Sequence, residues 1–338
     1  MFHEPSNMDM AMKLHYLKGI YYFGKQAFEG LATFKIKEPL FILLNYFPVI
    51  CGRFRRAESG RPYTKCTRLG EPKVALDKKF QLEFLNLLGK VVAGEKPNRP
   101  INLAHLKTKS TNSESPLKNM EDPLSLKRVG PVGDNWIPVD NCKMEAFSFS
   151  VNATQLSHLQ SKISSNGADF SPFEALSAVI WQCIANIRCE SAPNVVTICK
   201  MMEPNKAYGN NQLISVVKAA YPILEANPSE LAALMKNAAL DQIEKIENAI
   251  EKDNGVSDLI VYDANLTFAN LEEAKFYEFD YRGEKPVYVS YRVDGVGDEG
   301  AILVFPGPPK NGGRTVMAIL PENEVTELKS EMKKWFMD

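Results

Sequence analysis

The sequence predicts an α/β fold in two lobes, each with a mixed sheet flanked by helices. Its 338 residues are enough for about two domains. Segments with strand-like and helix-like patterns are interspersed without a strict βαβ rhythm, which favours mixed sheets. A polar stretch rich in Ser and Lys lies between them and almost lacks hydrophobic periodicity. We therefore predict a first lobe at 1–104, an inter-lobe connection at 105–130 and a second lobe at 131–338.

The predicted first lobe contains one strand and two helices. Residues 8–23 pass from a mixed polar segment into an aromatic and β-branched run that is typical of a strand. In 40–54, leucines at helical spacing predict an amphipathic helix that ends before a turn through Cys51 and Gly52. Residues 82–92 have the same apolar spacing and predict a second helix.

The predicted second lobe contains two helices with clear start signals. Ser171, followed by a proline and then Glu174, forms a capping box before a helix that has almost no polar face, which indicates a core helix. Another capping box at Asn227 predicts a long helix that reaches Glu251. The remaining predicted elements are strands at 145–151, 195–199, 213–217, 287–293, 301–305 and 315–320, and a last helix through Val325, Leu328, Met332 and Trp335.

Composition and charge disfavour several classes of protein. Forty Lys and Arg stand against 41 Asp and Glu, a net charge of -1 without any block of like charge, which disfavours nucleic-acid binding. Six cysteines without a C-x-x-C pair indicate reduced thiols of a cytosol-facing protein. The longest apolar stretch, 39–50, is too short for a spanning helix, so we expect no transmembrane segment. Any membrane association would then come through a partner or a surface patch.

Two glycine motifs have the spacing of phosphate-binding loops but not their context. Gly295 to Gly300 matches G-x-G-x-x-G, yet a strand sequence follows it instead of a helix, so we predict a turn between two antiparallel strands. Gly19 to Gln26 has P-loop spacing, but Gln26 stands where Ser or Thr should hold magnesium. Because no Cys/His set has metal-ligand spacing either, we predict no metal site and no bound cofactor.

The four histidines are the candidates for a general base. His3, His15, His105 and His158 each lack an acidic residue four positions further on. A general base needs an orienting group and a substrate within reach. We therefore assign no catalytic residue, and we interpret His15, beside a predicted strand, as a packed structural imidazole.

Several stretches together carry a resemblance to a known family. They are Met8–Tyr16, Leu40–Arg53, the S-P-x-E-x-L-x-A-x-x-W run with Ser171, Glu174 and Trp181, the sequence Tyr208-Gly209-Asn210, Val261–Leu271 and Val293–Gly300. Together they resemble the plant BAHD acyl-CoA-dependent acyltransferases, and most closely the eceriferum/glossy branch associated with cuticular wax. The resemblance implies a two-lobed fold like that of chloramphenicol acetyltransferase, a structural role for these motifs, and acyl-CoA as a substrate or ligand.

One motif of the family is present in altered form. The family's D-F-G-W-G-K-P is similar to Asp280-Tyr-Arg-Gly-Glu-Lys285-Pro286, in which the aspartate and the Lys-Pro pair are kept and the middle is lost. The family role of this aspartate is structural. The resemblance therefore implies that Asp280 holds an arginine through a charge-assisted bond.

A second departure removes the family's catalytic motif. The H-x-x-x-D sequence should lie shortly before Phe84, but the chain reads Ala-Leu-Asp-Lys-Lys-Phe over 75–80. Several tens of residues expected from the family are missing between Cys66 and Gln81, including first-lobe strands. We therefore expect an incomplete first lobe that has exposed strand edges and is the less stable of the two.

Three functions follow from the resemblance and its departures. The first is a non-catalytic accessory of the ketoacyl-CoA synthase, the condensing enzyme that elongates very-long-chain acyl groups for wax. Through that partner the chain would lie at the cytosolic face of the endoplasmic reticulum. Otherwise we expect it in the cytoplasm or the nucleus. The second is an active acyl-CoA-dependent acyltransferase that uses another base. The third is a shortened splice form or faulty gene model without an independent role.

Overall fold

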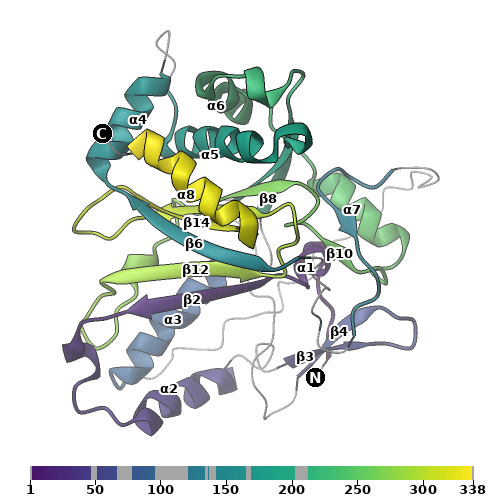
Figure 1. The fold of residues 1–338 in the computed structure, drawn as a ribbon. Coiled ribbons are helices and arrows are strands. Elements are labelled where there is room, and N and C mark those ends of the chain that lie inside the picture. Colours follow the sequence, from purple (N-terminus) through teal and green to yellow (C-terminus); the bar gives the residue numbers. More distant parts are fainter. Residues whose placement is uncertain are drawn as a thin grey trace.

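The centre of the molecule is a seven-stranded mixed sheet (Figure 1). The computed structural model describes residues 2–46, 52–66, 78–95, 121–133, 136, 142–164, 169–201 and 212–336. In spatial order the strands are β6 (Met144–Val151), β14 (Arg314–Pro321), β13 (Ala301–Pro306), β11 (Leu266–Asn270), β7 (Val195–Met201), β8 (Gln212–Lys218) and β9 (Leu240–Asp241). β11 runs parallel to both of its neighbours, and the other pairs are antiparallel.

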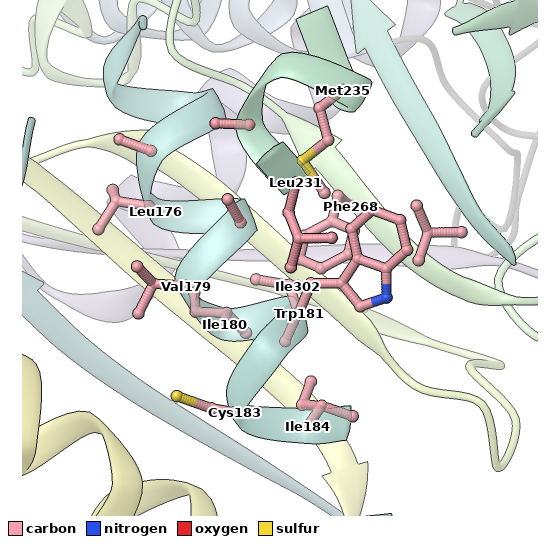
Figure 2. Packing of buried hydrophobic residues seen from close by; sticks show 14 of the residues in the cluster. Leu176, Val179, Ile180, Trp181, Cys183, Ile184, Leu231, Met235, Phe268 and Ile302 are labelled. Atoms are coloured by element: carbon pink, nitrogen blue, oxygen red, sulfur yellow. The ribbon is translucent and has the colours of Figure 1, made fainter. Parts of the chain in front are cut away.

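Helices cover one face of this sheet and enclose the largest hydrophobic core. They are α4 (Ala153–Ile163), α5 (Pro172–Arg188), α6 (Pro228–Asn237) and α8 (Glu322–Phe336), with short 3-10 turns η4 (Cys189–Ser191) and η5 (Ile223–Glu225). Figure 2 shows α5 in this core, where Trp181 lies beside Leu231 of α6 and Phe268 of β11. Because α5 has apolar residues on almost every side, it is buried between the sheet and the other helices.

Shorter elements cover the opposite face. They are α1 (Asn7–Met12), α7 (Ile243–Lys252), η6 (Phe276–Glu278), the pair β5 (Lys127–Arg128) and β10 (Leu259–Ile260), and a ribbon of β2 (Tyr16–Tyr22) and β12 (Tyr288–Asp294). β2 comes from the predicted first lobe and β12 from the second. The two parts of the chain therefore share a sheet.

The remaining elements come from the first hundred residues. α2 (Thr33–Tyr46) packs on α3 (Lys78–Val92) through a small cluster that includes Leu43, Leu44 and Val91. η1 (Lys25–Phe28) precedes α2. A small sheet has the order β1 (Phe2–His3), β4 (Pro62–Cys66) and β3 (Gly52–Arg56). None of the helices described is long and apolar enough to cross a bilayer.

Most of the predicted elements are confirmed, including the six second-lobe strands, the core helix α5 and the last helix α8. The long helix from Asn227 to Glu251 is wrong, because α6 ends at Asn237 and α7 begins only at Ile243. Between them, β9 pairs with the edge of β8, and this tertiary pairing outweighs the local helical pattern. The sequence predicts a turn through Cys51 and Gly52. Gly52 is instead the first residue of β3, and Cys51 lies outside the described residues.

Our predictions do not include α1, α4 or β11. α1 has a complete capping box, with Ser6 bonded to the Asp9 backbone and Asp9 to the Ser6 backbone, but it is only six residues long. β11 lies at the centre of the sheet, and its five residues are too few for a periodicity to be distinguished.

We predict that the amides of β2 and α3 exchange with solvent before those of β7 and β11. Within the described residues, β2 has a strand neighbour on one side only, and α3 packs on a small cluster, whereas β7 and β11 are central strands of a large core. Native-state hydrogen exchange with mass spectrometry measures the order. Equal protection of the two groups of elements would contradict the prediction.

Candidate functional site

Three of the stretches that carry the family resemblance meet at one buried position. His15 lies between them, and its Nε2 accepts hydrogen bonds from the backbone N–H groups of Val261 (2.9 Å) and Tyr262 (3.2 Å). The ring packs edge-on against Tyr262, with 4.7 Å between ring centroids. The backbone N–H of Gly297 donates to the carbonyl of Tyr262. We call this region the junction, since it ties the N-terminal segment to the second lobe.

His15 has a structural role at the junction, as the sequence predicts. The imidazole is buried, and desolvation lowers its pKa from 6.5 to about 3. Two backbone donors occupy the Nε2 lone pair, so the ring is neutral and carries its proton on Nδ1. A nitrogen in this state cannot accept a proton from a substrate.

The glycines between β12 and β13 allow close packing at the junction. A Cβ on Gly297 would overlap the Asp263 carboxylate, and one on Gly295 would overlap the carbonyl of Leu14. Asp263 accepts a hydrogen bond from the Glu299 backbone (3.2 Å) and pairs with Lys127 (2.5 Å). The predicted turn is present, but its two flanking strands do not pair, because β12 joins β2 while β13 joins the large sheet. The glycine spacing therefore reflects packing against a carboxylate.

A second polar cluster at the junction centres on Asp258. Its carboxylate pairs with the buried Lys13 (3.1 Å) and with Arg56 (2.8 Å), and accepts the backbone N–H of Val132 (2.8 Å). Arg56 also lies over the ring of Trp136, 4.5 Å from its centroid. Burial alone would raise the pKa of Asp258, but the Val132 hydrogen bond and the Arg56 and Lys13 charges hold it below its ordinary value. These residues join the end of α1 and β3 to the second lobe.

The predicted motif on α5 has structural contacts. Ser171 and Glu174 form a reciprocal capping box at the start of the helix. The indole N–H of Trp181 donates to the carbonyl of Pro193 (2.7 Å), so this fully buried ring is satisfied. Tyr208, Gly209 and Asn210 lie outside the described residues.

Asp280 has a different contact from the one that the resemblance implies. Its carboxylate accepts the backbone N–H of Gly283 (2.7 Å), and no arginine pairs with it in the described part of the chain. Arg282 (φ 59°) and Gly283 (φ 82°) form a tight turn between Tyr281 and Glu284, which bond to each other in both directions.

This turn replaces the middle of the family motif and directs the carboxylate back to its own backbone. Of the other two motif residues, Lys285 is exposed and Pro286 is buried.

The junction offers little means for chemistry. The carboxylates of Asp258 and Asp263 are ion-paired, and Nε2 of His15 accepts backbone hydrogen bonds. The described residues contain no group of side chains suited to a metal ion. His158 is exposed on α4. This helix lies at the outer side of the second lobe (Figure 1). Two surface hollows, about 370 and 420 Å³, lie elsewhere, beside η5 and on α2.

Comparisons with known proteins agree with the resemblance. The family model described as Transferase family matches residues 73–335. Protein ECERIFERUM 26-like of Arabidopsis thaliana is 33% identical, and the match covers 98% of this chain and 91% of that protein. Protein ECERIFERUM 2 of the same plant is 28% identical over 96% and 92%. The first alignment spans 392 positions, so at least 54 of them have no counterpart in a chain of 338 residues.

Solved structures confirm the two-lobed acyltransferase fold. TRI101 of F. graminearum, complexed with coenzyme A and deoxynivalenol, superposes with a TM-score of 0.70 at 12% identity, covering 99% of this chain and 98% of that one. Vinorine synthase superposes with a TM-score of 0.63 at 14% identity, covering 99% and 93%.

We predict that His15 makes the protein less stable in mild acid. Folding lowers the pKa of His15 from 6.5 to about 3, so the unfolded chain binds a proton that the folded chain excludes, and stability falls as the pH drops through this window. Between about pH 7.5 and pH 5, this group alone should lower the free energy of unfolding by about 2 kcal/mol.

Urea unfolding of wild type and His15→Gln at both pH values isolates the contribution of His15. His158→Gln, at an exposed imidazole, is the control and should lose as much as wild type. An equal loss in His15→Gln would contradict the assignment.

We predict that Gly297→Ala destabilises the fold by about 2–3 kcal/mol, because the new methyl group would collide with the Asp263 carboxylate. Gly130→Ala is the matched control, since nothing lies within 4 Å of its Cβ position. Thermal or urea unfolding measures both variants. If the two glycines tolerate alanine equally, the packing account of the glycine turn is wrong.

Proposed function

The chain belongs to the BAHD transferase family, and from this premise we propose that it supports very-long-chain acyl elongation for cuticular wax as a non-catalytic accessory. Its partner in this proposal is the ketoacyl-CoA synthase that carries out the condensing step, at the cytosolic face of the endoplasmic reticulum. The eceriferum names of its relatives support the wax assignment. The accessory role is supported by the hydrogen bonds that His15 Nε2 accepts from two backbone N–H groups. This is the observation that carries the proposal.

Acyl transfer needs a proton acceptor. When an alcohol attacks the thioester carbon, its O–H proton must pass to a base as the coenzyme A thiolate leaves, and such a base contributes about 10²- to 10⁴-fold in rate. His15 and His158 are the two histidines whose side chains are described. The first has no free lone pair, and the second is exposed on the outer helix α4. A surface that contacts a condensing enzyme needs no such base.

The second candidate is an active acyltransferase. Family membership favours it, as do fold neighbours whose structures hold coenzyme A. In either candidate, acyl-CoA is the ligand that the family fold would accept. The two differ in whether purified protein consumes the thioester.

We predict that co-expression with a ketoacyl-CoA synthase lengthens the acyl products by one or more elongation cycles, whereas the chain alone changes nothing. Gas chromatography of fatty acid esters from yeast measures the products. His158→Gln should keep the full effect, since the accessory role uses no imidazole. Unchanged chain lengths would contradict the proposal.

A second measurement tests the alternative directly. Purified protein is incubated with a very-long-chain acyl-CoA and an alcohol, and release of the free thiol is followed. If the protein is a non-catalytic accessory, the free thiol is released no faster than in the same mixture without protein. Faster release that produces the ester would favour the active acyltransferase.

A further inference from the structure

The charge of this nearly neutral chain is unevenly distributed. Residues 1–104 contain 17 Lys and Arg against nine Asp and Glu, an excess of eight positive charges. Residues 105–338 contain 23 against 32, an excess of nine negative charges. The net charge of -1 thus conceals a basic first lobe joined to an acidic remainder. Such an asymmetry points to an anionic partner surface on the basic side.

The helix α2 of this basic lobe exposes large apolar side chains. Leu43 and Leu44 are buried against α3, yet Phe41 is 61% exposed and Ile42 is 42% exposed on the other side of the same helix. A helix with apolar residues on both sides is ordinarily covered on both. Figure 1 shows α2 at the outer end of the first lobe, away from the large sheet. One of its apolar faces is therefore directed outward.

The outward face of α2 combines these apolar groups with lysines. Lys35 and Lys37 are exposed one to two turns before Phe41 and Ile42, and Glu38 is the single acidic residue of the helix. A hollow of about 420 Å³ lies along this face, lined by Lys37, Glu38, Phe41, Ile42 and Asn45. Aromatic and aliphatic groups beside lysines on one helix are the features of a segment that lies in a membrane interface.

We propose that the first lobe docks directly on an anionic lipid bilayer, with Phe41 and Ile42 of α2 inserted at the headgroup boundary and the lysines around them facing lipid phosphates. The inference rests on the proposed function only for the choice of membrane, the cytosolic leaflet that holds the elongase. The acidic remainder of the chain is repelled by the same surface. The charge asymmetry therefore directs the first lobe, which contains α2, toward the lipid and the second lobe toward the cytosol.

Two other anionic surfaces fit these observations less well. A nucleic acid would attract the positive charge, but its binding depends chiefly on phosphate contacts and gains nothing from inserting Ile42 into an apolar layer. An acidic protein surface would leave Phe41 against charged groups. A bilayer offers both an anionic surface and an apolar interior within a few ångströms of each other.

Vesicle flotation of the full-length chain tests the proposal. Vesicles of phosphatidylcholine alone are compared with vesicles that contain about 30% phosphatidylserine. We expect binding to the anionic vesicles that weakens as NaCl rises from about 0.1 M to 0.5 M, because salt screens the lysines. The double variant Phe41→Ser/Ile42→Ser should lower the partition coefficient about tenfold. Lys35→Glu/Lys37→Glu should lower it by a similar factor.

The matched control removes two exposed apolar side chains from the acidic part of the chain. Leu224 and Leu240 are 48% and 64% exposed, and Leu224→Ser/Leu240→Ser should bind vesicles as wild type does. Urea unfolding of each variant verifies the fold. Failure of wild type to bind, or equal binding by the Phe41/Ile42 variant, would overturn the proposal. The proposal would also be overturned if the protein bound a nucleic acid and did not bind the anionic vesicles. Because no elongase is present, the result is independent of the co-expression test.

Discussion

The structure depends on one buried acceptor at the junction. The backbone N–H groups of Val261 and Tyr262 lie between β10 and β11, outside both strands, and unpaired buried donors would each cost about 1–3 kcal/mol. His15 supplies the acceptor from a position 246 residues away in the chain. This contact fixes the start of β2, and β2 in turn fixes β12 through the register that pairs Tyr16 with Asp294. The N-terminal segment is thus placed by a hydrogen bond to the second lobe.

A packed face explains how the ribbon of β2 and β12 persists. Two paired strands alone are marginally stable, and they need a packed face. β2 and β12 obtain one from the core beneath them, where Tyr291 stacks on Phe276 with 4.1 Å between ring centroids. The ring of Tyr291 lies where a Cβ on Gly19 would be. Gly19, the first glycine of the P-loop-like spacing, therefore allows the ring to pack closely against β2. The ribbon is therefore held mainly from its packed face.

Local patterns in the sequence predict local structure here, and distant contacts account for the rest. The capping box at Ser171 and the apolar run after it predict α5 correctly because both signals lie within one helix. The cluster around Asp258 has no such signal, since Lys13 and Arg56 reach it from more than 200 residues away. The sequence predicts that His15 is a packed structural imidazole, but it does not identify the two backbone N–H groups that donate to Nε2. The partner of Asp280 was missed because a two-residue turn altered its direction.

The junction also bears on what a family motif means in a chain that lacks the catalytic sequence. The stretches around His15, Tyr262 and Gly297 pack against one another, and hydrogen bonds within the protein link them. Their presence is thus explained by folding, with or without turnover. A scaffold of this kind would keep its shape without a catalytic base, because the groups described at the junction hold the lobes together through contacts within the protein. Selection on a surface, for a partner or for lipid, would then be sufficient to maintain it.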